Sequence, residues 1–355
     1  MFINSKGVIM KKELLMGTAL VSTLGAASVA EAVTASMSGN HQTGMEFDSP
    51  TGGTDTNAQI NDNNFSVSLS ETTDGGMTIS SSFKVMDENT KEDYDAGFTL
   101  AFTDGSKLDV LNAGNASGSH AVSVPGSAGA EGVANTSTNM APTGLDFATG
   151  STAFGVEYHT AADFLADGLK ASISISTDNG ATATSTYKTD SHVAIGATYV
   201  TDLGDTAVTI GGGFSTTDGS RDGTMPSDDT QGMHIGLSAV TGDLTVAVGF
   251  ADGSVAGVSD NGSDEYTAEV VKAGVKYVTG DLTFNVGVAS GDADDHAMGG
   301  SDGADDSQEV TSASVSYAVA AGVTAILGYT TTDSSDEGGS TDDGSAWYIG
   351  ANMSF

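Results

Sequence analysis

The stretch VTGDLTVAVGF, residues 240–250, contains the pattern that decides the fold. From Leu244 to Phe250 every second residue is large and apolar, and the residues between are small or polar. A two-residue period is typical of a β-strand whose two faces meet different surroundings. The preceding Gly-Asp pair is typical of a tight hairpin, because both residues tolerate turn conformations. The sequence therefore predicts a two-faced strand that starts at a tight turn.

The same alternation recurs along the rest of the chain. A near copy, VTGDLTFNVG, begins at Val278, and the chain ends on the alternating WYIGANMSF at Phe355. Short connections alternate with long ones, and the fifteen connections predict sixteen strands. The short connections are residues 73–76, 103–106, 163–168, 201–205, 241–243, 279–281 and 320–322. The pattern changes phase at Val270 and Val271, which predicts a bulge or the edge of the apolar band.

Two all-β architectures could use such strands, a soluble sandwich and an outer-membrane barrel. The polar face consists of Ser, Thr, Gly and Asn throughout, which suits a water-filled interior, and aromatic residues gather near strand ends. Strict alternation of short and long connections is what a membrane-threaded meander requires. We therefore expect a 16-stranded antiparallel transmembrane β-barrel, which satisfies its backbone groups without an edge. Its short turns would be periplasmic and its long, acidic loops extracellular.

The first 32 residues are predicted to be a signal peptide. Lys11 and Lys12 precede an apolar run over residues 14–29, and Ala30-Glu31-Ala32 fits a signal-peptidase site. Residues 1–9 read as an upstream extension from a mis-assigned start codon, and a membrane anchor is the alternative for the apolar run. Residues 33–355 would form the barrel. Loss of three lysines and two glutamates takes the formal net charge from −36 to −37.

Composition excludes several classes of function. With 11 Lys+Arg against 47 Asp+Glu, the chain lacks the basic surface that nucleic-acid binding needs. There is no cysteine for disulfides or thiolate metal sites, and the sequence contains no nucleophile elbow or HExxH motif. We therefore expect no enzyme and no cofactor. The acidic stretches 292–309 and 333–344 are candidates only for weak Ca²⁺ binding.

Four stretches resemble the general diffusion porins of Gram-negative bacteria, most closely those of Rhodobacter and other alphaproteobacteria. They are KKELLMGTALVSTLGAASVAEA near the start, SETTDGGMTISSSFK (70–84), LDVLNAGNASG (108–118) and the terminal YIGANMSF. The resemblance implies a trimeric, sixteen-stranded barrel in the outer membrane, whose third loop folds into the lumen as a constriction. It also implies that the outer-membrane assembly machinery recognises the terminal Phe355. Outer-membrane lipid and small hydrophilic solutes would be the other partners.

The candidate site residues follow from this architecture. By the resemblance, the longest loop, about 115–150, is the constriction loop, with Glu131 and Asp146 as its acidic residues and His120 as a titrating neighbour. Strand parity turns five residues toward the pore, although the lysines could instead be interfacial or turn residues. These wall residues are Lys84, Lys107, Asp109, Lys272 and Lys276. The last strand would close the barrel against residues near 34–43, with its outward side chains at Trp347, Ile349, Met353 and Phe355.

The expected function is passive diffusion of small hydrophilic solutes and ions through a porin. Similar porins place a basic cluster on the pore wall, whereas Arg221 is the only arginine in this sequence and falls in an external loop. With a mature charge of −37, we expect the channel to prefer cations. The alternative is a secreted or surface-attached acidic β-protein, such as a Ca²⁺-dependent adhesin or a layer protein.

Overall fold

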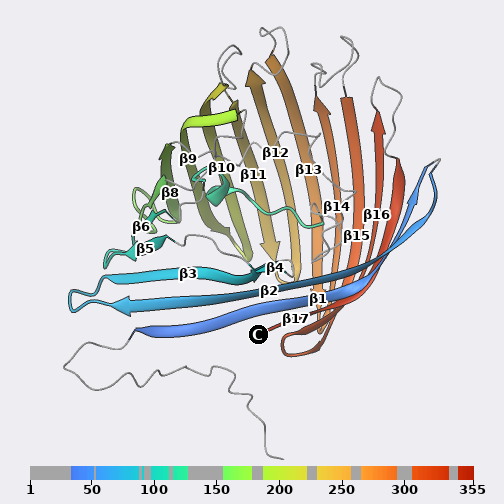
Figure 1. Ribbon diagram of the computed structural model, residues 1–355, viewed down its shortest axis with the longest axis horizontal. Coiled ribbons are helices and arrows are strands. Elements are labelled where there is room, and N and C mark those ends of the chain that lie inside the picture. The colour runs from blue at the N-terminus through green and yellow to red at the C-terminus, as the bar shows by residue number, and fades with distance from the viewer. Residues whose placement is uncertain are drawn as a thin grey trace, which may run out of the picture.

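A computed structural model describes residues 33–51, 53–87, 90–91, 97–111, 115–126, 155–177, 187–221, 230–256, 265–293, 306–335 and 343–355. These residues form one antiparallel sheet that closes on itself, as Figure 1 shows. Within them no helix is long and apolar enough to cross a membrane. The short strand β4 pairs with β3 beside β5, so these two pieces share one position and the barrel has the expected sixteen positions.

The elements follow each other in chain order around the barrel. They are β1 (Thr34–Pro50), β2 (Thr56–Thr72), β3 (Thr78–Asp87), β4 (Thr90–Lys91), β5 (Phe98–Ala101), β6 (Lys107–Val110), the 3₁₀ turn η1 (Gly118–His120), β7 (Gly155–His159), β8 (Leu169–Thr177), β9 (Tyr187–Leu203), β10 (Thr206–Arg221), β11 (Thr230–Thr241), β12 (Leu244–Ala256), β13 (Glu265–Thr279), β14 (Leu282–Ala293), β15 (Asp306–Ala320), β16 (Val323–Ser335) and β17 (Gly344–Ser354). The hairpins predicted from Gly-Asp and similar pairs lie together at one rim.

The barrel closes where β17 pairs with β1. Their register runs from Asn40 opposite Ser354 to Pro50 opposite Gly344. The expected partner, residues 34–43, was placed too early, because β1 extends beyond the end of β17 and residues 34–38 pair with β2 alone. At the end of the seam, the Phe355 amide donates to the Gly39 carbonyl at 3.1 Å. The last residue is therefore part of the closed wall.

The outer face of the barrel is apolar and the inner face is polar or small. On β12 the side chains of Val246 and Val248 are 43% and 45% exposed, whereas Ala247 between them is 1% exposed. A soluble protein would bury such a row, since it costs about 25 cal/mol for each Å² of apolar surface left in water. An exposed apolar belt on nearly every strand is what a barrel in a lipid bilayer presents.

The apolar belt has a different boundary at each rim. Near the short turns it ends on outward aromatic side chains, among them Tyr199, Tyr277 and Tyr317. Toward the long loops it ends on carboxylates of β12 to β16. In strand order these carboxylates are Asp252, Glu269, Asp292, Glu309 and Asp333. Charged side chains on the lipid face are costly near the bilayer midplane, so the hydrocarbon must lie between these two boundaries.

The phase change at Val270 and Val271 is the edge of this belt and not a bulge. Pairing of β13 with β12 and with β14 is regular there. Val271 is the last outward apolar side chain before Glu269, whereas Val270 is 3% exposed and faces inward. Register shifts occur instead at Phe65/Ser66, Asp218/Gly219 and Ala318/Ala320.

The described wall has unequal height around the barrel. Strands β5, β6 and β7 contain 4, 4 and 5 residues, whereas β9 and β10 contain 17 and 16. A transmembrane strand needs about 9–11 residues to cross the hydrocarbon. We call β5–β7 the low wall and β9–β14 the tall wall.

Candidate functional site: the lumen and its inner loop

Residues 115–126, the described start of the longest loop, lie inside the barrel. They run across the inner face of the tall wall from β9 to β14, as the teal trace in Figure 1 shows. The wall carries a glycine at seven positions beneath this inner segment. We call this set the glycine row; its members are Gly196, Gly211, Gly213, Gly236, Gly249, Gly274 and Gly287. Their sequence neighbours, such as Ile195 and Ile235, point outward and are exposed.

The glycine row lets backbone meet backbone. A Cβ atom placed on Gly274 would lie 1.9 Å from the carbonyl oxygen of Pro125, and one on Gly211 would lie 2.3 Å from that of His120. Such distances are far below van der Waals contact, so no side chain fits at these positions unless the inner segment moves. Glycine within a strand often marks this kind of close approach.

His120 fixes the start of the inner segment to the wall. The imidazole is hydrogen-bonded through Nδ1 to Thr198 Oγ1 at 2.7 Å and through Nε2 to Ser172 Oγ at 2.8 Å. Burial lowers the pKa of His120 from its ordinary value, and the neighbouring His159, His234 and Lys170 add to this effect. The ring is therefore neutral at pH 7, and its two nitrogens act as one donor and one acceptor.

Further polar contacts hold the inner segment on either side of His120. The Ser119 hydroxyl donates to Glu157 Oε1 at 2.8 Å, and the His234 Nε2–H donates to the Ser117 carbonyl at 2.8 Å. At the far end, the Ser312 hydroxyl donates to the Gly126 carbonyl. These bonds satisfy backbone and side-chain groups that the segment would otherwise bury unpaired.

Histidines that look dispersed in the sequence thus converge on η1. His159 and His234 sit at inward positions of β7 and β11, and their neighbours Tyr158, Met233 and Ile235 point outward and are exposed. The Ser172 hydroxyl lies 2.8 Å from both His159 Nδ1 and His120 Nε2 and bridges the two rings. Strand parity alone could have placed His159 and His234 in the lumen, but spacing along the chain could not have shown that they meet.

Two of the predicted wall lysines lie beside the inner segment. Lys276 lines an open pocket with His120, Val122 and Pro125, and Lys272 lines a neighbouring pocket with Val122 and Val124. Lys84 lies opposite Ser66 on the exposed part of β3. Their influence on conduction stays a prediction.

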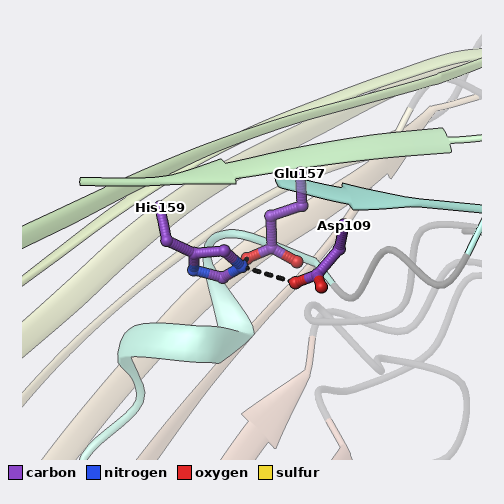
Figure 2. A group of neighbouring side chains, drawn as sticks. All are labelled: Asp109, Glu157 and His159. Atoms are coloured by element: carbon purple, nitrogen blue, oxygen red, sulfur yellow. Dashed lines mark hydrogen bonds and ion pairs between the residues drawn. The ribbon is translucent and has the colours of Figure 1, made fainter. Parts of the chain in front are cut away.

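The other predicted wall residues belong to the low wall. Asp109 is buried on β6, where its Oδ2 lies 3.3 Å from Lys107 Nζ and 2.9 Å from His159 Nε2. Figure 2 shows Asp109 beside His159 and the fully buried Glu157, which sequence reasoning missed. Glu157 alternates with the outward Val156 and Tyr158, so its inward position could have been found by parity.

The predicted closure residues lie at the seam between β17 and β1. Trp347, Ile349, Met353 and Phe355 all point outward and are exposed. Trp347 contacts Tyr329 with ring centroids 4.4 Å apart, and Phe355 lies 6.3 Å from Phe65. Recognition of Phe355 by the assembly machinery stays a prediction.

Several expectations fall on residues outside the described ranges. Glu131, Asp146, the signal peptide over residues 1–32 and most of the acidic stretches 292–309 and 333–344 are among them. The constriction role of the first two, the processing of the signal peptide and weak Ca²⁺ binding stay predictions.

Comparisons with known proteins agree with the architecture. The profile of the Gram-negative porin family matches residues 17–337. No curated protein sequence matches the chain. Among solved structures, a porin refined at 1.8 Å resolution shares 17% identity over 90% of this chain and 100% of its own, with a TM-score of 0.63.

Two further structures have similar folds. An anion-selective porin from Comamonas acidovorans shares 10% identity, covers 91% of this chain and 100% of its own, and has a TM-score of 0.63. A mutant of the Rh. blastica porin shares 15% identity, covers 90% of this chain and 100% of its own, and has a TM-score of 0.58. The family match and the exposed apolar belt argue against a secreted acidic β-protein. The chain belongs to the Gram-negative porin family, and it is an outer-membrane diffusion channel and not an enzyme.

Proposed function

We propose that this porin passes small hydrophilic solutes and ions and prefers cations over anions. The observation that carries the proposal is the charge of the chain, which has 47 acidic residues against 11 basic ones. A strongly acidic surface raises the local concentration of cations at a channel mouth and lowers that of anions. Lumen charges then set the selectivity at the narrowest point.

The described lumen has few basic side chains that could favour anions. Arg221, the only arginine, is the last residue of β10 at the long-loop end. In the described lumen the basic residues beside the inner segment are the lysines Lys170, Lys272 and Lys276. Lysine side chains spread along a wall do not form the dense cationic cluster that favours anions.

The proposal of cation preference rests on the charges of the chain, because the barrel fold does not determine ion selectivity. The Comamonas acidovorans porin has a similar barrel and is described as anion-selective. The same architecture is therefore compatible with either preference, and the side chains in and around the lumen decide between them.

The test of cation preference is the reversal potential of the purified porin in a planar bilayer under a KCl gradient. We expect the sign of a cation-selective channel, and an anion-selective sign would refute the proposal. Neutralising the loop carboxylates with Glu131→Gln and Asp146→Asn should reduce the preference. A matched control neutralises two carboxylates in short turns, Asp205→Asn and Asp281→Asn, and should change it less, because these residues lie at the far rim.

We further propose that the assembly is a homotrimer that covers the low wall. Apart from β4, the strands β5–β7 are the shortest that the structure describes, with 4–5 residues each. A neighbouring subunit would shield this face from lipid. One Vibrio cholerae relative of similar fold, OmpT, is described in a trimer form. Light scattering of the detergent-extracted porin should give three chains per particle, and one chain would contradict the proposal.

A further inference from the structure

Three groups able to bind a metal converge on the inner face of the low wall. Asp109 on β6 lies directly opposite Glu157 on β7, and His159 follows two residues later on the same face. One ligand atom from each lies within 4.8 Å of the other two. His159 Nε2 is 2.9 Å from Asp109 Oδ2 and 3.4 Å from Glu157 Oε1. Figure 2 shows the three side chains turned toward one another.

The charge of this cluster is poorly balanced. Asp109 is 6% exposed and Glu157 is 1% exposed, so two carboxylates are buried side by side. Lys107 reaches only Asp109, at 3.3 Å, and its own side chain is 45% exposed. Among the described residues, Glu157 contacts the neutral Ser119 hydroxyl and the titratable His159 ring. A buried carboxylate is costly without a positive partner, and a cation between the three groups would supply one.

The geometry fits a divalent transition metal. Ligand atoms about 2.0–2.1 Å from a tetrahedral Zn²⁺ are about 3.3 Å apart, close to the two distances that His159 Nε2 already makes. The third separation, between the two carboxylates, is at most 4.8 Å and would shorten when an ion binds. One imidazole with two carboxylates suits Zn²⁺ and its neighbours, whereas Ca²⁺ and Mg²⁺ prefer oxygen ligands alone.

The surroundings orient the ligands as the outer shell of a metal site does. His159 Nδ1 is hydrogen-bonded to Ser172 Oγ at 2.8 Å, which directs Nε2 toward the carboxylates. The Ser119 hydroxyl holds Glu157 Oε1 at 2.8 Å. Hydrogen bonds of this kind fix the ring orientation of metal-bound histidines and hold ligating carboxylates.

We propose that Asp109, Glu157 and His159 bind one divalent transition-metal ion on the lumen wall, and that Lys107 gives up its contact with Asp109 when the ion enters. A bound ion adds two positive charges to the lumen beside the inner segment. Cation preference should therefore fall when the site fills. Channel formation without metal does not depend on the site, so it is tested separately by conductance in the presence of a chelator.

The experiment is a calorimetric titration of the detergent-purified porin with Zn²⁺ in excess Mg²⁺, which occupies loose carboxylate sites. We expect one tight Zn²⁺ per chain. The near-isosteric variants Asp109→Asn and Glu157→Gln, and His159→Gln, should each weaken binding about tenfold or more. Asp104→Asn, in the turn of the same hairpin, removes a carboxylate outside the site and should bind as the native protein does.

Heat-modifiable gel migration and metal-free conductance verify that each variant is folded. As a second readout, Co²⁺ in place of Zn²⁺ should give a visible absorption band that His159→Gln changes. The proposal is overturned if the native porin binds no Zn²⁺ under these conditions. It is equally overturned if the three site variants bind Zn²⁺ as tightly as Asp104→Asn.

Discussion

The low wall and the tall wall hold the same inner segment in different ways. The low wall uses a side chain, since Glu157 accepts a hydrogen bond from Ser119. The tall wall contributes two polar side chains, Thr198 and His234, and otherwise carries glycine, so that the backbone of residues 115–126 rests on the glycine row. The low wall therefore holds the segment through a polar side chain, whereas the tall wall holds it mainly through close backbone contact. A change at the tall wall should displace the segment, whereas a change at the low wall should only loosen it.

The largest effect is expected from one methyl group on the glycine row. In Gly274→Ala the new Cβ would lie 1.9 Å from the Pro125 carbonyl oxygen, which belongs to the backbone and cannot swing aside. We expect a loss of about 3 kcal/mol in the free energy of unfolding, the upper range for overpacking, together with altered single-channel conductance.

Gly249→Ala is the matched control for this variant. Its Cβ would meet the tip of the Val124 side chain at 3.4 Å and the Ile235 carbonyl oxygen at 4.0 Å. We expect a change within about 0.5 kcal/mol and native conductance, because an ordinary contact replaces empty space. Equal behaviour of Gly249→Ala and Gly274→Ala would show that the inner segment does not rest on this wall.

A smaller effect is expected at the low wall. Ser119→Ala removes the hydroxyl that donates to Glu157 Oε1 and leaves the glycine row intact. A hydrogen bond to a charged group is worth about 1.5 kcal/mol, and we expect that loss in the free energy of unfolding. Current noise should rise while mean conductance stays near native. A shift in mean conductance as large as that of Gly274→Ala would erase the distinction between the two walls.

The wall lysines should affect selectivity modestly. Lys272→Gln or Lys276→Gln removes one positive charge beside the inner segment. One charge about 10 Å from a permeating ion in water is worth about 0.4 kcal/mol, with opposite sign for cations and anions, so the cation-to-anion permeability ratio should change by a factor of about four. The reversal potential should shift toward stronger cation preference, and less so at high salt. No shift at low salt would place both lysines outside the ion path.

The smallest effect is expected in a turn remote from both contacts. Asp104 accepts hydrogen bonds from the Ser106 hydroxyl at 2.7 Å and amide at 2.9 Å, which hold the pKa of Asp104 below its ordinary value. Its stabilising contribution is therefore present above about pH 4 and disappears as the pH falls through the lowered pKa. Asp104→Ala should unfold at a slightly lower temperature than native at pH 7 and at the same temperature at strongly acidic pH. A gap that widens in acid would contradict this sign.

The barrel could be predicted from sequence because lipid and water impose the two-residue period directly. Turn pairs such as Gly242-Asp243 set the hairpins, and the phase change of the apolar pattern at Val270 marked the edge of the belt. The closing register was misplaced, since nothing in residues 34–50 shows how far β1 runs past β17. The alternation predicts which face of the sheet each residue occupies, but it does not predict the tilt of a strand or its stagger against its neighbours.

The interior could be predicted only in part, because alternation shows which residues face inward but not which of them meet. Parity placed Asp109 and Lys276 inward, and it could equally have placed Glu157 and His159 there. The glycine row was not recognised, because a lone glycine in a strand such as β12 has several ordinary explanations. Its meaning appears only when seven glycines on neighbouring strands lie under one segment.

The most direct test of the account is a disulfide between the inner segment and the tall wall. The chain has no cysteine, so Val124→Cys with Gly249→Cys creates a single pair. A Cβ on Gly249 would lie 3.4 Å from Val124 Cγ2, within reach of a disulfide. We predict rapid cross-linking of the folded porin in the outer membrane, seen as a gel shift that a reductant reverses, with a channel that still conducts. The control pair Val124→Cys with Asp205→Cys should not cross-link. A conducting porin in which the Val124–Gly249 pair fails to cross-link would contradict the account.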